Sequence, residues 1–449
     1  MATARAISRL QDRLTALSAH SEDFWAFKDD SDRDLAHSLF QYPAMMVPRL
    51  QRVLLDELLE ADPTSQSIFD PYVGSGTVMT EAMLRGLNFG GVDVNPLAVL
   101  LCRAKAGPYL HEAYADEARF VVATASSDRA TRVEAAFPGL EKWFNPRVIQ
   151  ELSALRRAIS RQPDLAMRRF LWVALAETVR LTSNSRTSTV KLHMRSTPDI
   201  DHRMHLSPID VLSRVAIRNA ASLRDQSNLL VERGLAMSGH YQHDVQVRIG
   251  DARNPPDAVS RTYDMVMTSP PYGDNHTTVT YGQHSFLPLQ WIDLADIEDG
   301  LDAECIRSTH EIDARGLGGS LKEALKRVDV LRDRSPSLRV TLDELATRPT
   351  NGAKRVSAFI SDFEESLDPI LRRLKRNGLM LWIVGDRKVN GLTVPTTNII
   401  TELLGNRAEL IAAIDRPIKN KRHAHRNSVA ATMTHEAILV YRKLRNDMT

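Results

Sequence analysis

The sequence predicts an α/β protein with a Rossmann-like, largely parallel sheet that is interrupted by helical insertions. Three observations predict this fold class: short apolar strands alternate with helical patterns, a Gly-x-Gly turn follows an early strand, and three strands end in an acid. The acids are Asp70, Asp93 and Asp251. Parallel strands bring their carboxyl ends to one edge of the sheet, where open α/β sheets bind ligands. We therefore expect the three acids to lie together at a ligand site.

The composition is that of an ordinary globular protein. Of the 449 residues, 43% are hydrophobic and 25% are charged, and the net charge of +2 gives no overall basic field that would indicate nucleic acid. No apolar run has the length of a membrane span, and the N-terminal residues lack the apolar core of a secretory signal. The two cysteines, Cys102 and Cys305, allow neither a disulfide framework nor a zinc cluster. We expect a cytoplasmic protein without membrane or metal partners.

The N-terminal residues predict two helices separated by a polar connector and an apolar turn. In the first helix, Leu10, Leu14 and Leu17 share one side. Two prolines, Pro43 and Pro48, then enclose the apolar turn. Pro48 opens the second helix at the first helical position, where a missing N–H is tolerated. By itself this pattern indicates only helices that pack on a sheet.

The stretch from Ser67 to Thr77 predicts a strand, a glycine turn and the start of a helix. Such a turn lets the backbone approach a ligand closely, and the helix N-terminus offers free amide donors. A Gly-x-Gly pattern alone is weak evidence for a nucleotide-like ligand. The next strand strengthens it, because Asp93 follows the glycines at the spacing of a carboxylate that accepts both hydroxyls of an adenosine ribose. Asn95 and Pro96 then cap a helix.

Two insertions interrupt the alternation of strands and helices. The first, residues 104–240, has mainly helical patterns and a Ser/Thr/Arg-rich stretch from Arg180 to Ser188. A connection of this length is too long to be structureless. The second, residues 296–355, is charged and only partly helical. Basic residues concentrate in the first insertion and in the loop 416–427, where they suit phosphate contacts and solvated surfaces equally.

These insertions divide the chain into five predicted parts. Residues 1–103 hold the N-terminal helices, the apolar turn and the first half of the core, and residues 104–240 form the first insertion. Residues 241–295 return to core strands and carry a Pro-Pro loop. Residues 296–355 form the second insertion, and residues 356–449 complete the core.

The Pro-Pro loop follows the apolar strand Tyr263–Met267 and has the sequence Thr268-Ser269-Pro270-Pro271-Tyr272. Two consecutive prolines prevent both a continuing ladder and a helix start, so the chain must leave the sheet in a stiff loop. An isolated Pro-Pro is most often a simple turn. Here the glycine turn and the acids converge on the same edge, so the loop would bring a hydroxyl, a proline carbonyl and an aromatic ring to the ligand site.

The glycine turn, the ribose-type acid and the Ser-Pro-Pro-Tyr sequence together resemble the motifs of the amino-methylating DNA methyltransferases. These enzymes transfer a methyl group from S-adenosylmethionine to an exocyclic amine of cytosine or adenine. Asp70–Thr77 resembles the cofactor motif of the family and Ser269–Tyr272 its catalytic motif. Asp251 is similar to the acid near the cofactor adenine, and Tyr42–Pro48 to the segment that closes over the methionine part. The resemblance covers about residues 35–103, 245–292 and 356–442.

The resemblance implies a Rossmann-like methyltransferase fold with an antiparallel last strand, S-adenosylmethionine as cofactor and double-stranded DNA as partner. The catalytic residues would be Ser269, Pro270, Pro271 and Tyr272. The cofactor-binding residues would be Tyr42, Pro48, Asp70, Pro71, Gly74, Ser75, Gly76, Thr77, Asp93, Asn95, Asp251, Ala252 and Ser269.

The resemblance also implies where DNA is contacted. We expect Arg186 in the first insertion and Lys421 and Arg422 in the C-terminal loop to bind it. The cofactor motif precedes the catalytic motif, which departs from the circularly permuted order common in the family, so either insertion is a candidate for target recognition. A cognate restriction endonuclease, as in a restriction-modification system, is a further partner that the family allows.

The catalytic motif predicts how the amine is activated. The lone pair of an aromatic exocyclic amine is delocalised into the ring, and acceptors on both amine hydrogens would free it for attack. The Ser269 hydroxyl and the Pro270 carbonyl are the candidates, while Tyr272 would stack on a base flipped out of the duplex. Serine at the first motif position resembles the cytosine-N4 subgroup more than the adenine-N6 subgroup, where Asp or Asn is usual.

Three alternatives stay open. DNA adenine-N6 methylation would use the same motifs. RNA amino-methylation is disfavoured because its tRNA-acting relatives usually carry an RNA-binding domain ahead of the catalytic one, and few residues precede Tyr42. A non-catalytic binder of an adenosine cofactor would have no need of Ser269 together with Asp93 and Asp251. Carbon-5 cytosine methylation does not fit, since neither cysteine follows a proline.

Overall fold

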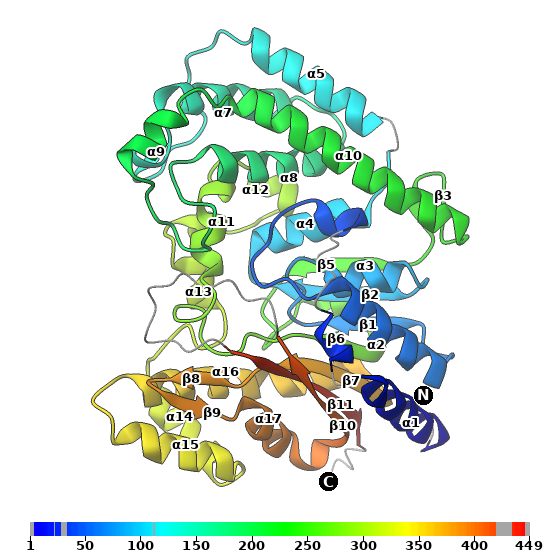
Figure 1. The fold of residues 1–449 in the computed structure, drawn as a ribbon. Coiled ribbons are helices and arrows are strands. Elements are labelled where there is room, and N and C mark those ends of the chain that lie inside the picture. Colours follow the sequence, from blue (N-terminus) through cyan, green and yellow to red (C-terminus); the bar gives the residue numbers. More distant parts are fainter. Residues whose placement is uncertain (1–3, 22, 28–33, 111–112, 419–432, 445–449) are drawn as a thin grey trace.

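The chain folds around one seven-stranded sheet (Figure 1). The computed structural model describes residues 4–21, 23–27, 34–110, 113–418 and 433–444. The strands stand in the order β10-β11-β7-β6-β1-β2-β5. Their bounds are β1 (Ser67–Asp70), β2 (Asn88–Asp93), β5 (Val245–Ile249), β6 (Tyr263–Thr268), β7 (Leu374–Val384), β10 (Ala408–Pro417) and β11 (His435–Lys443).

Five neighbouring strands, β7, β6, β1, β2 and β5, pair in parallel. Strand β11 lies between β7 and β10 and runs antiparallel to both. This arrangement confirms the predicted fold class, a Rossmann-like α/β fold whose sheet is largely parallel with an antiparallel last strand. Strands β1 and β6 are neighbours, with Phe69 opposite Val266. The strand that leads into the glycine turn and the strand that leads into the Pro-Pro loop therefore end side by side.

The sheet separates two hydrophobic cores. Along β6, Met265 and Met267 belong to one core and Val266 to the other, as the two-residue period of a strand requires. On β7, Leu381 and Trp382 alternate in the same way. Strands that are apolar on both faces are typical of a parallel sheet covered by helices on both sides.

Helices of the first insertion form a layer above the sheet in the view of Figure 1. The layer contains α5 (Ala113–Ser127), α7 (Pro146–Ser160), α8 (Leu165–Thr182) and α10 (Pro208–Glu232). Helix α8 packs on α4 (Pro96–Ala106), and Trp172 and Leu100 belong to the same core. The layer thus extends the core on that face of the sheet instead of forming a separate core.

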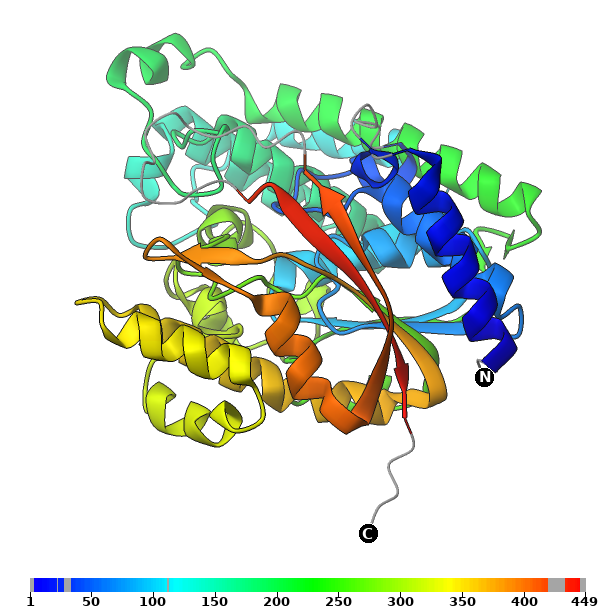
Figure 2. The same ribbon diagram turned by 60° about the horizontal axis from the view of Figure 1, so that its bottom comes forward.

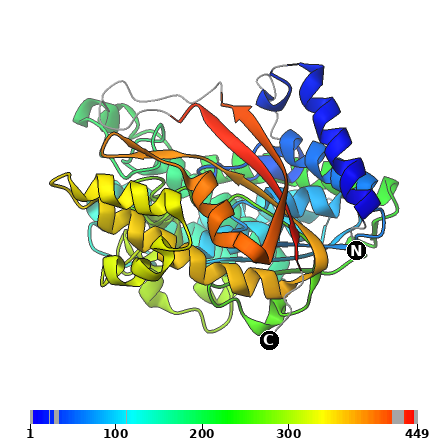
Figure 3. The ribbon, with the colours of Figure 1, turned by 90° about the horizontal axis from the view of Figure 1, so that it is seen from below.

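The opposite face is covered by helices from the C-terminal part of the chain (Figure 3). These are α14 (Ala324–Arg332), α15 (Pro336–Ala346), α16 (Gly352–Arg373) and α17 (Thr396–Leu404). Helix α1 (Ala4–His20) lies beside β10, where Gln11 Nε2 donates to the Ile411 carbonyl at 2.7 Å (Figure 2). The N-terminal helix therefore covers the antiparallel end of the sheet.

The remaining elements are short or connect the sheet to its helices. Helices α2 (Pro48–Ala61) and α3 (Thr77–Met83) flank β1 in the sequence. The others are η1 (Phe24–Ala26), η2 (Leu35–Ser38), α6 (Leu140–Trp143), α9 (Thr197–His202), β3 (Ala236–Met237), β4 (His240–Tyr241), η3 (Asp257–Val259), α11 (Tyr281–Leu289), α12 (Leu294–Ile297), η4 (Ala303–Ile306), α13 (Glu311–Arg315), β8 (Arg387–Val389), β9 (Leu392–Val394) and η5 (Gly405–Arg407). In the described ranges, none of the helices has the length and apolar character needed to cross a membrane.

Among the described helices, three begin with a residue whose side chain caps the helix by a hydrogen bond and is followed directly by proline. Asn95 Oδ1 accepts from the Leu97 N–H at 3.1 Å at the start of α4. Ser207 and Ser335 cap α10 and α15 in the same way. Proline has no N–H to satisfy at the first helical position, and the cap oxygen takes up one of the free amides that follow. The predicted cap at Asn95 and Pro96 is confirmed.

Candidate active site

A pocket lies at the carboxyl edge of the sheet, where β1, β2, β5 and β6 end. Its walls contain these residues of the predicted cofactor set: Tyr42, Pro71, Gly74, Asp93, Asn95, Asp251, Ala252 and Ser269. Pro271 of the catalytic motif also lines it. The other predicted cofactor residues are outside the lining: Pro48, Asp70, Ser75, Gly76 and Thr77. The structure therefore brings residues of the cofactor motif and of the catalytic motif to one cavity.

Asp93, at the end of β2, is held by two backbone amides. Its Oδ2 accepts from the Gly74 N–H and its Oδ1 from the Asn95 N–H, both at 2.8 Å. Burial raises the pKa of Asp93 to about 6, although these two bonds favour the ionised form. A carboxylate offers about four lone-pair sites, so about two acceptor sites stay available at the pocket wall. This carboxylate fits a ligand that presents a pair of hydroxyls.

The second position of the glycine turn requires glycine. Gly76 has a φ of +74°, and a Cβ at this position would lie 2.8 Å from Cys102 Sγ in α4. The turn also receives a hydrogen bond from Lys105, whose Nζ donates to the Ser75 carbonyl at 2.7 Å. Helix α4 thus fixes the backbone of the turn from the side of the core and leaves its other side to the pocket.

A hydrogen bond joins the end of β1 to the end of β6. Thr268 Oγ1 donates to Asp70 Oδ1 at 2.6 Å, and the Tyr72 N–H donates to the same oxygen at 3.0 Å. Asp70 is fully buried, and its Oδ2 has no partner among the residues that the structure describes. Burial raises the pKa of Asp70 to about 7 against the effect of these hydrogen bonds. Asp70, the first residue of the cofactor motif, is therefore hydrogen-bonded to Thr268, the residue that precedes Ser269.

Asp251 is paired with an arginine two residues further on. Arg253 Nε donates to Asp251 Oδ2 at 2.8 Å, and the Arg253 N–H donates to Oδ1 at 2.9 Å. The same guanidinium lies 3.1 Å from Asp362 in α16. The charge of Asp251 is thus compensated within the protein, which its place at a strand end did not predict.

The Ser269–Tyr272 loop places two hydroxyls next to each other. Ser269 Oγ lies 3.1 Å from the Tyr272 hydroxyl. Burial and the neighbouring carboxylate of Glu436 raise the pKa of Tyr272 well above its ordinary value. The ring packs against Gly385, where a Cβ would lie 3.1 Å from Cδ2. The loop is therefore held between the pocket and the end of β7.

Tyr42 closes the pocket on the side of the N-terminal segment. Its hydroxyl accepts from Asn95 Nδ2 at 2.9 Å, and Asn95 Nδ2 also donates to Ser285 Oγ at 2.8 Å. The Tyr42 ring stacks on Tyr281, with ring centroids 5.7 Å apart and planes inclined by 27°. These contacts join the N-terminal segment to α4 and α11 at the pocket wall.

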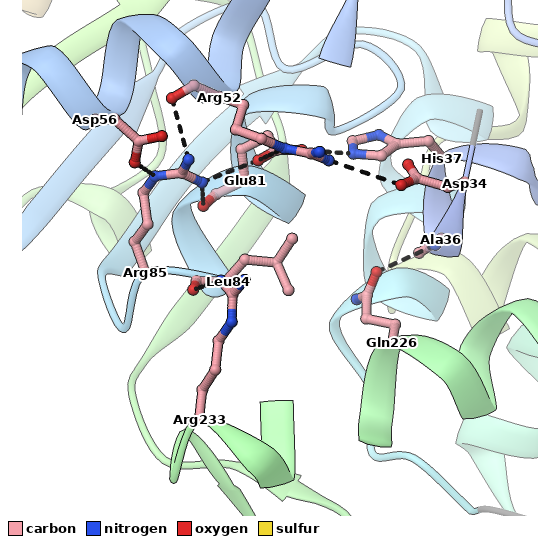
Figure 4. Close-up of polar contacts among 10 residues, drawn as sticks. All are labelled: Asp34, Ala36, His37, Arg52, Asp56, Glu81, Leu84, Arg85, Gln226 and Arg233. Atoms are coloured by element: carbon pink, nitrogen blue, oxygen red, sulfur yellow. Dashed lines mark hydrogen bonds and ion pairs between the residues drawn. The ribbon is translucent and has the colours of Figure 1, made fainter. Parts of the chain in front are cut away.

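A buried ionic cluster holds the segment that carries Tyr42 (Figure 4). Glu81 of α3 is fully buried, and its carboxylate lies 3.2 Å from His37 Nε2, 3.1 Å from Arg52 and 2.9 Å from Arg85. Although burial opposes ionisation, the hydrogen bonds from His37 and Arg52 lower the pKa of Glu81 to about 2. His37 belongs to η2, a few residues before Tyr42, so this cluster ties the segment that leads to Tyr42 to α3, the helix that follows the glycine turn.

The loop after Tyr272 is held by a buried acid. Asp274 accepts from Thr277 Oγ1 at 2.7 Å, and its two oxygens lie 3.3 Å from Arg355 and Arg387. Arg387 belongs to β8 and also donates to Thr277 Oγ1 at 3.0 Å. The C-terminal part of the chain therefore supports the loop that follows the catalytic motif.

A second, polar cleft of about 260 Å³ opens beside the pocket and shares Tyr42 with it. Residues between Ser183 and Leu192, which overlap the Ser/Thr/Arg-rich stretch 180–188, form one wall. Helix α11 forms another through His284, Leu287 and Pro288. The Leu192 N–H donates to Gln283 Oε1 of α11 at 3.1 Å and holds this stretch in place. The lining contains hydroxyl and basic side chains and, within the described residues, no acidic one.

Several basic side chains of the predicted clusters are already paired. Arg157 lies 2.8 Å from Asp128, Arg168 lies 2.8 Å from Asp296, and Arg416 is buried against Glu436. Arg186, in contrast, is exposed and lines the polar cleft. In the part of the chain that the structure describes, its guanidinium has no hydrogen-bond or ion-pair partner. The other two residues predicted to contact DNA, Lys421 and Arg422, lie outside the described residues.

Comparison with known proteins finds a relative that is similar over nearly the whole chain. The type II methyltransferase M.MvaI of Kocuria varians is 28% identical over 455 residues, which cover 97% of each chain. No protein-family model matches the chain. The fold and this similarity support a methyltransferase.

Solved structures resemble the methyltransferase only distantly. TrmN of Thermus thermophilus is 10% identical with a TM-score of 0.28, over 89% of this chain and 49% of that chain. The rRNA methyltransferase aviRa of Streptomyces viridochromogenes is 12% identical with a TM-score of 0.32, over 93% and 96%. These scores are too low to support any further comparison.

Some of the pocket lining was not predicted from the sequence. Asn275 and Tyr281 come from the stretch after the catalytic motif, and Ile312, Gly316 and Leu317 come from the second insertion. The second insertion contains the turn sequence Leu317-Gly318-Gly319, but no motif there predicts a place in the pocket wall. Among the described residues, no group of three or more His, Cys, Asp or Glu side chains is placed to hold a metal ion.

Proposed function

We propose that this methyltransferase transfers a methyl group from S-adenosylmethionine to the N4 amine of a cytosine flipped out of double-stranded DNA. One observation carries the proposal: Asp93, from the cofactor motif, and Ser269, from the catalytic motif, line the same pocket. The similarity to a type II methyltransferase supports DNA as the substrate. Cytosine is favoured over adenine because the first residue of the catalytic motif is serine.

The residues of the pocket fit an adenosyl cofactor. Asp93 keeps acceptor sites for the two ribose hydroxyls, and Gly74, the first glycine of the turn, would bring its backbone close to the ligand. Tyr42 and Ser269 would face the methionine end, and Asp251 and Ala252 the adenine end. Bound S-adenosylmethionine would supply a methyl group activated by a sulfonium.

The protein would contribute alignment and hydrogen bonding. Ser269 Oγ and the Pro270 carbonyl would accept the two hydrogens of the target amine, which favours the tetrahedral nitrogen and its free lone pair. Tyr272 would stack on the flipped base. The amine would gain the methyl group, S-adenosylhomocysteine would be left as the second product, and the amine would release one proton to solvent. Positioning of nitrogen, methyl and sulfur in one line would supply much of the rate enhancement.

The polar cleft is our proposed path for the DNA backbone. Its hydroxyl and basic lining offers donors to phosphate oxygens without an opposing carboxylate. Arg186 would contact phosphate there, and Lys421 and Arg422 remain proposed contacts. The first insertion lines this cleft whereas Ile312–Leu317 of the second lines the cofactor pocket, so we assign target recognition to residues 104–240. A cognate restriction endonuclease and action in the cytoplasm belong to the same proposal.

The test is methylation of unmodified plasmid DNA with tritiated S-adenosylmethionine, followed by digestion to nucleosides. We expect N4-methyldeoxycytidine, and we expect its loss in Ser269→Ala and in Tyr272→Ala. N6-methyldeoxyadenosine as the product would support the alternative of adenine methylation. Label in tRNA but not in DNA would reject a DNA substrate, and cofactor binding without transfer to any nucleic acid would leave a non-catalytic binder. Sequencing of the labelled DNA with modification detection would give the target site.

A further inference from the structure

The amide of Asn275 is a polar group of the pocket wall whose oxygen has no partner in the protein. Asn275 is only 4% exposed and lines the pocket at the carboxyl edge of the sheet. Its Oδ1 is buried and, among the residues that the structure describes, accepts no hydrogen bond. Buried amide oxygens are nearly always paired, because an unpaired one loses its hydrogen bonds to water without replacement. A donor on a bound ligand would satisfy this oxygen.

Asn95, the other asparagine of this wall, has its partners within the protein. Its Oδ1 accepts from the Leu97 N–H at 3.1 Å. Its Nδ2 donates to the Tyr42 hydroxyl at 2.9 Å and to Ser285 Oγ at 2.8 Å. The Asn95 amide therefore joins elements of the wall to one another, whereas the oxygen of Asn275 is available to a ligand.

The second insertion fixes the position of the Asn275 amide. A Cβ on Gly316 would lie 2.7 Å from Asn275 Nδ2, so the backbone of the insertion passes directly against the amide. The turn that contains Gly316 is itself held by α16, because the Gly318 N–H donates to Asp362 Oδ2 at 2.8 Å. A buried amide beside a fixed backbone has little freedom to turn away from the pocket.

Contacts of the same turn connect Asn275 to the end of β5. The Arg315 carbonyl accepts from Arg253 Nη2 at 3.2 Å, and Arg253 Nε donates to Asp251 Oδ2 at 2.8 Å. Asp251 follows β5 and Ser269 follows β6, and β1 and β2 stand between these two strands. Neighbouring strands are about 4.8 Å apart, so the two strand ends are separated by roughly 14 Å. Asn275 is thus connected to the Asp251 side of the pocket, which is the side that we assign to adenine.

An asparagine amide matches the hydrogen-bonding edge of adenine. Adenine presents an exocyclic amine, which donates, beside a ring nitrogen, which accepts. The oxygen of an amide accepts and its NH₂ group donates, so the two edges can pair through two parallel hydrogen bonds. We propose that Asn275 is a specificity-determining residue for the cofactor, and that its Oδ1 accepts from the 6-amino group of the adenine in S-adenosylmethionine. The inference rests on the proposed function and extends it to the second insertion, whose turn holds the amide.

The test compares the affinity for S-adenosylhomocysteine with the affinity for an analogue in which hydrogen replaces the 6-amino group of the base. The analogue keeps the ribose, the homocysteine part and the ring nitrogens, so it lacks only the donor. Calorimetry gives both Kd values for the parent and for Asn275→Leu, whose side chain is similar in size and has no polar atoms. The parent should bind the analogue roughly 10- to 100-fold more weakly, because the Asn275 oxygen then stays unpaired. In Asn275→Leu this ratio should fall by about tenfold.

A second variant moves the amide without removing it. In Gly316→Ala the added methyl group would meet Asn275 Nδ2 at 2.7 Å and displace it, so the ratio of the two Kd values should fall here as well. Equal binding of the two ligands by the parent would overturn the inference. It would also be overturned if Asn275→Leu kept the ratio of the parent but methylated DNA more slowly in a single turnover, since Asn275 would then act on the target base. If Asn275→Leu does not fold, Asn275→Ala replaces it.

Asn88→Leu is the matched control. Asn88 begins β2, at the edge of the sheet opposite the pocket, and its amide is paired. Its Nδ2 donates to the Gln66 carbonyl at 3.2 Å, and its Oδ1 accepts from the Asp244 N–H at 2.9 Å. Both Kd values should equal those of the parent. Failure of the parent to bind S-adenosylhomocysteine would reject the cofactor of the proposed function, whereas binding with the same ratio in the parent and in Asn275→Leu would reject only the role of Asn275.

Discussion

Replacement of Asp70 by asparagine should change the dependence of the unfolding free energy on pH. The unfolding free energy of the variant minus that of the parent should be larger at alkaline than at acidic pH. Asp70 is fully buried, and burial raises its pKa from 3.8 to about 7. A carboxyl whose pKa is raised on folding stabilises the folded state below its unfolded pKa, and this contribution is lost as the pH rises through the folded pKa. Asparagine keeps an oxygen that accepts from Thr268 Oγ1 and the Tyr72 N–H but cannot ionise.

The magnitude follows from the two pKa values. The difference between 3.8 and about 7 corresponds to a loss of about 4 kcal/mol in the parent once the pH exceeds 7. At pH 5 only about 1.5 kcal/mol of this loss has developed. The unfolding free energy of Asp70→Asn relative to the parent should therefore rise by about 2–3 kcal/mol between pH 5 and pH 8.

Urea denaturation of both proteins at pH 5 and pH 8 measures this difference. Asp264→Asn is the control of opposite sign, because Asp264 accepts from Lys375 and Ser67 at 2.7 Å each and these bonds lower its pKa despite burial. The ionised Asp264 carboxylate stabilises the folded state at any pH above the pKa of Asp264 in the unfolded state. Asp264→Asn should therefore be destabilised by a similar amount at pH 5 and at pH 8. The reasoning would be refuted if the difference in unfolding free energy between Asp70→Asn and the parent were the same at pH 5 and at pH 8.

Three further outcomes follow from the site. Glu81→Gln should lower the unfolding free energy by about 3–5 kcal/mol in urea denaturation, because Arg52 and Arg85 lose their buried counter-charge; a change below 1 kcal/mol would contradict this. Asp93→Asn should weaken S-adenosylhomocysteine binding roughly 10- to 100-fold in calorimetry, since only the ionised carboxylate accepts both ribose hydroxyls. For the same reason, the affinity of the parent for this ligand should decrease when the pH is lowered below 6. Arg186→Gln should reduce the slope of log K for DNA against log salt by about 1, while the exposed control Arg119→Gln should not.

The sequence predicted the sheet and the edge at which its motifs meet, because these depend on backbone patterns. Apolar strands alternate with helices, and the Pro-Pro pair forces the chain out of the sheet directly after β6. The sequence did not predict how the acids are partnered. Asp93 binds backbone amides, Asp251 binds Arg253, and Asp70 keeps an unsatisfied oxygen within the described part of the chain. These differences depend on burial and on side-chain directions that a strand-end pattern does not contain.

The insertions were the least predictable part for the same reason. Leu317 lines the pocket at the carboxyl edge of the sheet although no motif predicts this, because its position depends on the packing of a long connection against α16. For the basic residues, in contrast, a pattern in the sequence suggested a site where the structure shows paired side chains. Arg168 and Arg416 belong to basic stretches of the sequence, yet both are paired with acids from elsewhere in the chain. A basic cluster in the sequence is therefore not by itself evidence for a polyanion site, and Arg186 differs from Arg168 and Arg416 in that its guanidinium has no partner among the described residues.

Contacts link residues of the cofactor motif to the last strand of the sheet through the Ser269–Tyr272 loop. Thr268 donates to Asp70 on one side of the loop, Ser269 Oγ lies 3.1 Å from the Tyr272 hydroxyl, and the carboxylate of Glu436 on β11 is near enough to raise the pKa of Tyr272 together with burial. The sheet order makes this possible, because β6 lies between β1 and β7, and β11 follows β7. An antiparallel β11 starts at the edge where the parallel strands end, so its first residues reach the catalytic loop. In a wholly parallel sheet, the strand next to β7 would begin at the far edge and could not supply Glu436 to Tyr272.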